Sequence, residues 1–156
     1  MRSVKFSRIA ALAVSLVLAA ASLCACASDP GGGSGTISAD GELTVHFLDV
    51  GQADSTLLVS DGEAMLIDAG NRDDAAFITG YLADQGIDHL KYIVFTHPHE
   101  DHIGSGEAVI AAADVDRIFM MDGYDEGIDA SLKRAVDENG IATTAPEPGD
   151  TAQLGE

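Results

Sequence analysis

A single short segment, Thr96-His97-Pro98-His99-Glu100-Asp101-His102, contains three of the chain's five histidines. Neutral imidazoles and carboxylates are ligands that zinc accepts in proteins. His97 and His99 are two residues apart, so in an extended segment their side chains point to the same side, while Asp101 and His102 follow on a turn. The segment therefore predicts a metal site with donors for two neighbouring ions.

The residues before these histidines help to distinguish a metal site from the simpler alternative, a solvated polar loop. The run Lys91-Tyr92-Ile93-Val94-Phe95-Thr96 is short, apolar, and rich in aromatic and β-branched residues. This composition predicts a strand that is buried on both faces. The histidines begin where the strand ends, and this position favours the metal site over the solvated loop.

The first 25 residues have the pattern of a secretory signal. Arg2, Lys5 and Arg8 precede an apolar stretch at 9–21, which is too short to remain as a membrane span. Leu23-Cys24-Ala25-Cys26 then resembles the bacterial lipobox, in which the last cysteine is lipidated. We expect residues 1–25 to be removed. The alternative is an ordinary signal peptide that releases a soluble protein.

Residues 26–41 are expected to form a flexible linker. Glycine and serine dominate 28–35, and such a segment cannot bury enough apolar surface to offset the entropy of ordering. The lipid on Cys26 would hold the protein at the extracellular face of the bacterial cytoplasmic membrane. Because Cys24 would leave with the signal, no intramolecular disulfide is expected.

The charge of the chain disfavours nucleic acid as a partner. The formal net charge is −18, with 8 lysines and arginines against 26 aspartates and glutamates. Nonspecific binding to a phosphate backbone depends on a basic surface, and the sequence shows no basic stripe. The acidic residues are scattered, so solubility is sufficient to explain them.

From residue 42 onwards the pattern predicts strands and then alternating strands and helices. Asp61-Gly62 predicts a tight hairpin turn, because these residues accept a left-handed backbone. His46 lies on the polar face of the first strand, and we interpret it as structural. The predicted strands are 42–47, 54–60, 63–68, 91–96, 117–121 and 141–144, and the predicted helices are 75–82, 105–113 and 128–139.

The histidine segment resembles the zinc motif His-x-His-x-Asp-His of metallo-β-lactamase-fold hydrolases. Residues 47–55 and 66–70 also resemble segments of one subgroup, the extracellular hydrolase domain of ComEC-type competence proteins and its freestanding relatives. The likeness runs from about Leu43 to the end. It implies an α/β fold, a partial metallo-β-lactamase αββα sandwich with a mixed sheet and flanking helices, over residues 42–156.

The resemblance also implies roles for individual residues. His97 and His99 would bind the first zinc, and Asp101 and His102 the second, with Asp101 also orienting the attacking hydroxide. Asp68 and Asp49 would support the site by accepting hydrogen bonds from ligating histidines; a simple turn is the alternative for Asp68. The sequence departs from the subgroup at Ala53 and at Ser105, where glycine is common.

The family pattern continues beyond what these 156 residues contain. It includes a further histidine, a bridging aspartate, a last histidine and a second half of the sandwich. We therefore expect this chain alone to bind zinc weakly and to be inactive. Apolar residues such as Val94, Phe95, Ile118 and Phe119 should be poorly covered, which predicts self-association.

Three functions follow from the sequence. The first is a membrane-tethered, zinc-dependent hydrolase that acts on a small molecule or a phosphodiester. The second is a noncatalytic surface lipoprotein or interaction module that retains the fold. The third is a competence-linked nuclease, which rests on family analogy alone and which the net charge disfavours.

Overall fold

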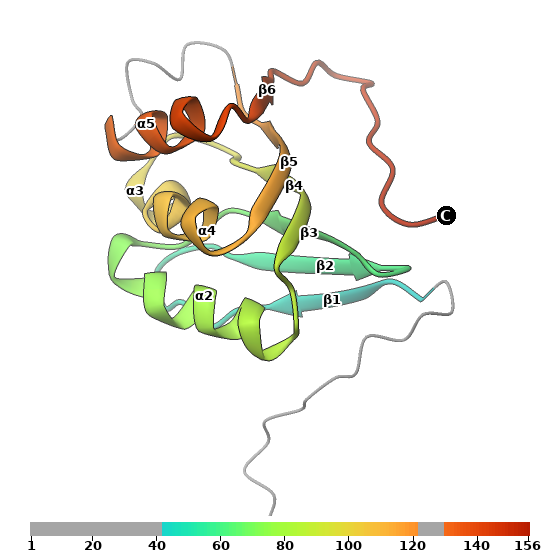
Figure 1. The fold of residues 1–156 in the computed structure, drawn as a ribbon, viewed down its shortest axis with the longest axis horizontal. Helices are drawn as coiled ribbons and strands as arrows, with labels where there is room; N and C mark the ends of the chain where they lie inside the picture. Colours follow the sequence, from blue (N-terminus) through green and yellow to red (C-terminus); the bar gives the residue numbers. More distant parts are fainter. Residues whose placement is uncertain (1–41, 122–129) are drawn as a thin grey trace, which may run out of the picture. The chain divides into compact units, whose positions relative to one another are not determined.

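The computed structural model describes residues 42–121 and 130–156. In these residues a mixed sheet has the strand order β1-β2-β3-β4-β5-β6 (Figure 1). The first three strands are antiparallel neighbours, and β3, β4, β5 and β6 run parallel. The strands are β1 (Thr44–Phe47), β2 (Thr56–Ser60), β3 (Glu63–Ile67), β4 (His89–Val94), β5 (Asp114–Phe119) and β6 (Ala142–Thr144).

Helices occupy the connections between the parallel strands. The segment from β3 to β4 contains a short 3-10 helix and α2, the segment from β4 to β5 contains α3 and α4, and α5 precedes β6. Their bounds are η1 (Arg72–Asp74), α2 (Ala75–Asp84), α3 (Glu100–Ile103), α4 (Gly106–Ala112) and α5 (Ala130–Asn139). The predicted mixed α/β sheet with flanking helices is thereby confirmed.

The turn between β2 and β3 has the conformation that its sequence predicts. Asp61 and Gly62 both have positive φ, at 49° and 78°. Two left-handed residues match the right-handed twist of the flanking strands in a two-residue hairpin loop. The turn fixes the register, in which Ser60 pairs with Glu63 and Leu57 pairs with Leu66.

The helices cover one face of the sheet (Figure 1). Leu57, Leu66, Ile93 and Ile118 are paired in register across β2, β3, β4 and β5, and each is 0% exposed. Helical residues such as Ile78 in α2 belong to the same apolar cluster. This continuous core fixes where the ends of β3 and β4 lie, and those ends carry the candidate site.

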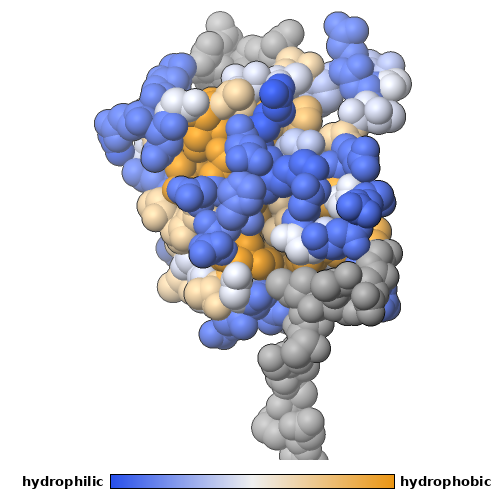
Figure 2. All heavy atoms as spheres, turned by 45° about the vertical axis from the view of Figure 1, so that its right-hand side comes forward, coloured by the Kyte–Doolittle hydropathy of each residue, from blue (hydrophilic) through white to orange (hydrophobic). Residues whose placement is uncertain are grey.

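The opposite face of the sheet is more open. Its central residues Leu58, Met65 and Val94 are half-buried. At the edge strand β1, Val45 is 41% exposed and Phe47 is 83% exposed on this face. Figure 2 shows apolar surface between polar side chains in its view.

The end of the chain contacts the β2–β3 hairpin. After β6 it runs on the side of the sheet away from the helices (Figure 1). The backbone N–H of Gly155 donates to the Glu63 carboxylate at 2.7 Å, and that of Glu156 donates to Asp61 at 2.8 Å. These contacts join the last residues to the β2–β3 hairpin.

Several local predictions were wrong. Strand β4 begins at His89, and only Leu90 and Ile93 within it are buried, whereas a strand buried on both faces was predicted. Strand β5 begins at Asp114, three residues before the predicted start. Phe95 and Ile118, predicted to be poorly covered, are 2% and 0% exposed because their side chains lie in the core under the helices.

Other predictions fall partly or wholly outside the described residues. The signal over 1–25, Cys26 and the linker over 26–41 all lie there, as do the first two residues of the helix predicted over 128–139. Among residues 42–121 and 130–156, no helix has the length and apolar character needed to cross a membrane.

Candidate metal centre

The candidate metal centre forms where three loops meet beyond the ends of β3 and β4. These strands are parallel, with Ile67 paired to Val94, so the residues that follow them emerge at the same edge of the sheet. Asp68 follows β3, and Thr96 to His99 follow β4. The segment before β2 joins them, since the Asp54 backbone N–H donates to the Asp101 carbonyl at 3.1 Å.

Asp68 organises this edge of the sheet from a buried position. It is 3% exposed, and its carboxylate accepts hydrogen bonds from the Thr96 N–H at 2.8 Å and the Thr96 hydroxyl at 2.7 Å. Its φ of 57° is unusual for a residue with a side chain. The surrounding hydrogen bonds hold this conformation, and the loop after β4 is fixed to the end of β3.

The same carboxylate orients His102. Asp68 Oδ2 lies 2.8 Å from Nδ1 of His102, which is 8% exposed. An ionised carboxylate can only accept, so Nδ1 carries the hydrogen, and in the neutral imidazole Nε2 then has the lone pair that can bind a metal. A histidine fixed in this way by a carboxylate is the usual arrangement of a metal ligand.

Nε2 of His102 faces further donors for a metal. Donor atoms of His97, Asp101 and His102 all lie within 4.8 Å of one another. The His102 Nε2 to Asp101 Oδ2 distance is 3.5 Å. Ligands around a tetrahedral zinc are about 3.4 Å apart, given bonds of about 2.1 Å. The side chains present therefore fit a zinc ion.

His99 lies beside this group without joining it. Its ring centroid is 4.7 Å from that of His97, and the His97 ring is 3.8 Å from that of His102. His99 also precedes α3, and its carbonyl accepts the N–H groups of His102 and Ile103. Asp101 and His102 consequently lie in a short helix, where the sequence suggested a turn.

The remaining predicted residues lie elsewhere. Asp49 is exposed and accepts a long hydrogen bond of 3.4 Å from the Gly51 N–H within its own loop. Its role beside a histidine stays a prediction. His46 contacts the Tyr81 hydroxyl through Nδ1 at 2.8 Å, which connects β1 to α2 and agrees with a structural role.

Neither departure from the subgroup strains the backbone. Ser105 has a φ of −94°, and its hydroxyl donates to the Asn71 carbonyl. Positive φ among the non-glycine residues of the described ranges is confined to Asp61 and Asp68, so Ala53 needs no glycine. The nearby position that does require glycine is Gly104, because a Cβ there would lie 2.3 Å from the backbone nitrogen of Arg72.

Sequence reasoning missed Thr96 and Asp54. Thr96 donates twice to Asp68, and Asp54 Oδ2 lies 3.7 Å from Nε2 of His102. Thr96 directly precedes His97, and Asp54 lies within the segment 47–55 that carries the family resemblance. These positions in the sequence could have indicated that the two residues lie near the site. They do not reveal that Thr96 contacts Asp68 or that Asp54 lies near His102.

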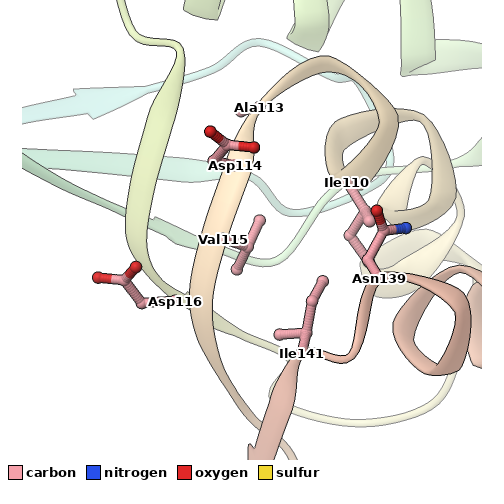
Figure 3. Close-up of a pocket in the computed structure, with 7 residues that line it drawn as sticks. All are labelled: Ile110, Ala113, Asp114, Val115, Asp116, Asn139 and Ile141. Carbon is pink, nitrogen blue, oxygen red and sulfur yellow. The ribbon is translucent and has the colours of Figure 1, made fainter.

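A separate hollow lies at the other end of the parallel strands. It is lined by the start of β5, including Asp114 and Val115, and by Asn139 and Ile141 (Figure 3). Figure 3 shows Val115 and Ile141 turned into it, with Asp116 on the other side of the strand. Because the histidines follow the end of β4, this hollow is not part of the candidate metal centre.

The chain is similar to several known proteins. The chain is 28% identical over 137 residues to ComE operon protein 3 of Bacillus subtilis (strain 168), covering 76% of this chain but only 17% of that protein. A Cronobacter sakazakii metallo-beta-lactamase with a HARLDQ motif is 26% identical, with a TM-score of 0.43 over 47% of this chain and 29% of that one. A metallo-beta-lactamase from Hirschia baltica is 17% identical, with a TM-score of 0.42 over 72% and 52%.

The family match covers most of the folded part. Residues 48–153 match the metallo-beta-lactamase superfamily, and this range contains the histidine segment, Asp68 and the strands that position them. The chain belongs to the metallo-beta-lactamase superfamily.

Proposed function

We propose that this chain is part of a zinc-dependent hydrolase tethered to the membrane through a lipid on Cys26. The observation that carries the metal-dependent part is the arrangement around His102. Its Nδ1 is held by buried Asp68 at 2.8 Å, and its Nε2 faces Asp101 at 3.5 Å. Membership of the metallo-beta-lactamase superfamily supports a metal-dependent hydrolase.

The donors divide between two ions in the proposal. His97 and His99 would hold one zinc, and Asp101 and His102 the other, with His97 next to both ions because its donor atom also lies within 4.8 Å of those of Asp101 and His102. When bound, zinc supplies Lewis acidity that polarises an ester or phosphodiester and lowers the pKa of water. Asp68 keeps His102 in the tautomer that binds metal, and the half-exposed Asp101 carboxylate can accept a hydrogen bond from the attacking water and orient it.

A small phosphodiester or ester is the substrate that the charge favours. The formal net charge of −18 repels a long phosphate backbone, whereas a small substrate presents few charges. Hydrolysis of bis(p-nitrophenyl) phosphate by the zinc-loaded, full-length protein tests the activity. We expect turnover that Asp101→Asn lowers by at least tenfold. No turnover of any model ester or diester with zinc bound would refute the hydrolase.

The tether is tested separately from the chemistry. In bacteria grown with labelled palmitate, the wild-type protein should carry the label and sediment with membranes. Cys26→Ala should lose the label, whereas Cys24→Ala serves as the matched control and should keep it. Equal labelling of wild type and Cys26→Ala would show that the lipobox interpretation is wrong.

A further inference from the structure

We propose that Asp54 is a third protein ligand for the cation that Asp101 and His102 hold, an inference that rests on the proposed function. Asp54 Oδ2 lies 3.7 Å from Nε2 of His102, and Asp101 Oδ2 lies 3.5 Å from the same nitrogen. The three atoms come from the segment before β2 and from α3. Two carboxylate oxygens therefore flank one imidazole lone pair.

The distances distinguish a ligand set from a set of hydrogen bonds. A charge-assisted hydrogen bond between nitrogen and carboxylate oxygen is about 2.7–2.9 Å long. The Asp54 and Asp101 oxygens are well beyond that distance from His102 Nε2, at 3.7 Å and 3.5 Å. Two ligands of one tetrahedral zinc are about 3.4 Å apart. Both separations match neighbours around an ion better than hydrogen-bonded partners.

The chemistry of the three atoms leads to the same conclusion. The hydrogen of the His102 ring is on Nδ1, where it is donated to Asp68 at 2.8 Å. Nε2 of the neutral ring and the two carboxylate oxygens near it are the kinds of donor atom that zinc binds. His102 is 8% exposed, so water cannot surround its ring. A divalent cation bound there would use the lone pair of His102 and one oxygen of each carboxylate.

The position of Asp54 is fixed by its backbone. Its N–H donates to the Asp101 carbonyl at 3.1 Å, and its carbonyl accepts from the Gly70 N–H at 2.9 Å. These bonds join Asp54 to α3 and to the loop after β3. The side chain itself is 73% exposed and contributes little to the core. A substitution of the carboxylate should therefore change metal binding without unfolding the protein.

A third ligand would give the ion the number of protein ligands that a catalytic zinc site usually has. Catalytic zinc sites usually contain three protein ligands and one open position for water. With His97 assigned to the first ion, as proposed above, Asp101 and His102 give the second ion two ligands, and Asp54 gives the third from a segment that precedes the histidine motif by more than 40 residues. The open position is then left for water or substrate.

Cobalt titration of the full chain tests the inference without relying on activity. Co²⁺ substitutes for Zn²⁺, and its visible absorption reports how many ligands surround it. We expect Asp54→Asn to weaken Co²⁺ binding by 10- to 100-fold and to change the absorption band, while the melting temperature stays at the wild-type value. Asp84→Asn is the control, because Asp84 is an exposed aspartate at the end of α2 outside the site, and it should behave as wild type.

The outcomes separate this inference from the proposed function. Wild-type affinity and an unchanged band in Asp54→Asn, with binding abolished in His102→Ala, would refute the role of Asp54 and leave the metal centre intact. Absence of Co²⁺ and Zn²⁺ binding by the wild-type chain would refute both. An equal loss in Asp84→Asn and Asp54→Asn would also overturn the inference, because general negative charge would then explain the binding.

Discussion

Asp68 Oδ2 lies 2.8 Å from Nδ1 of His102, although the two residues are 34 positions apart in the chain. The contact connects the end of β3 to α3 and determines which nitrogen of His102 is available to a metal. Asp68 also accepts two hydrogen bonds from Thr96, so a single buried carboxylate holds both the histidine and the loop that carries it.

Replacing this carboxylate should reduce both stability and metal affinity. Asp68→Ala leaves the Thr96 and His102 donors without their acceptor, and we expect the free energy of unfolding to fall by about 2–4 kcal/mol. Zinc affinity should fall by about 10- to 100-fold, because the tautomer of His102 is no longer fixed. Urea unfolding and zinc titration measure the two effects.

A control separates the buried carboxylate from negative charge in general. Asp49→Ala removes an exposed aspartate that bonds only within its own loop at 3.4 Å, and its unfolding free energy should change by less than about 0.5 kcal/mol. Equal destabilisation by the two substitutions would contradict the organising role of Asp68.

Two adjacent leucines of β2 test the difference between the faces of the sheet. Leu57 is 0% exposed in the core under the helices, whereas Leu58 is half-buried on the opposite face. Leu57→Ala should cost about 2–5 kcal/mol of unfolding free energy, and Leu58→Ala less than half of that. Denaturant unfolding of both variants gives the comparison. Equal costs would mean that the second face is covered as fully as the first.

The contact between the end of the chain and the hairpin should depend on pH through Glu63. A hydrogen bond from Lys91, followed by one from the Gly155 N–H, holds the pKa of Glu63 below its usual 4.5, and the bond to Glu63 raises the pKa of Lys91 above its usual 10.5. A lowered carboxyl pKa stabilises the fold above 4.5, and this contribution disappears as the pH falls through the lower folded value. The raised pKa of Lys91 stabilises below 10.5, and that contribution disappears as the pH rises through the folded value.

The amide signal of Gly155 in an NMR titration reports this contact. We expect the signal to shift with a midpoint below 4.5, and the shift to be absent in Glu63→Gln. A Gly155 amide that is insensitive to pH between neutral and acid conditions would show that the end of the chain does not rest on the hairpin.

The open face of the sheet should promote self-association. Phe47 is 83% exposed on this face, at the edge strand β1. We expect the wild-type chain to form dimers or larger species in sedimentation velocity, and Phe47→Ser to shift it towards monomer. Phe77→Ser is the control, since Phe77 is 46% exposed on α2, and it should have little effect. A monomeric wild type would contradict this prediction.

The elements with local signals were predictable from the sequence. Asp61-Gly62 specified its own turn because the left-handed backbone is a property of those two residues. Strand β4 was misplaced by two residues at its start because His89 joins the sheet through pairing with Asp114, a partner 25 positions away. The pattern of hydropathy along the chain does not indicate such a pairing.

The candidate site, too, could be predicted only in part from the sequence. The ligand types in the histidine segment were apparent from residue identity alone, and donor atoms of His97, Asp101 and His102 do lie within 4.8 Å of one another. The approach of Asp54 to His102 was not apparent, because it depends on the backbone bond between Asp54 and Asp101. The short helix α3 was missed because four residues are too few to show a helical period.

The amount of zinc bound per chain tests the central claim most directly. After equilibrium dialysis against Zn²⁺ at a concentration high enough to fill a weak site, and metal analysis of the dialysed solution, the wild-type chain should bind at least one zinc. His89→Ala, which removes an exposed histidine paired with Asp116 outside the site, should bind as much as wild type. The double variant His97→Ala/His102→Ala should retain almost none, while its far-UV circular dichroism stays that of wild type. A wild-type chain without zinc, or a folded double variant that binds as much zinc as wild type, would contradict the account.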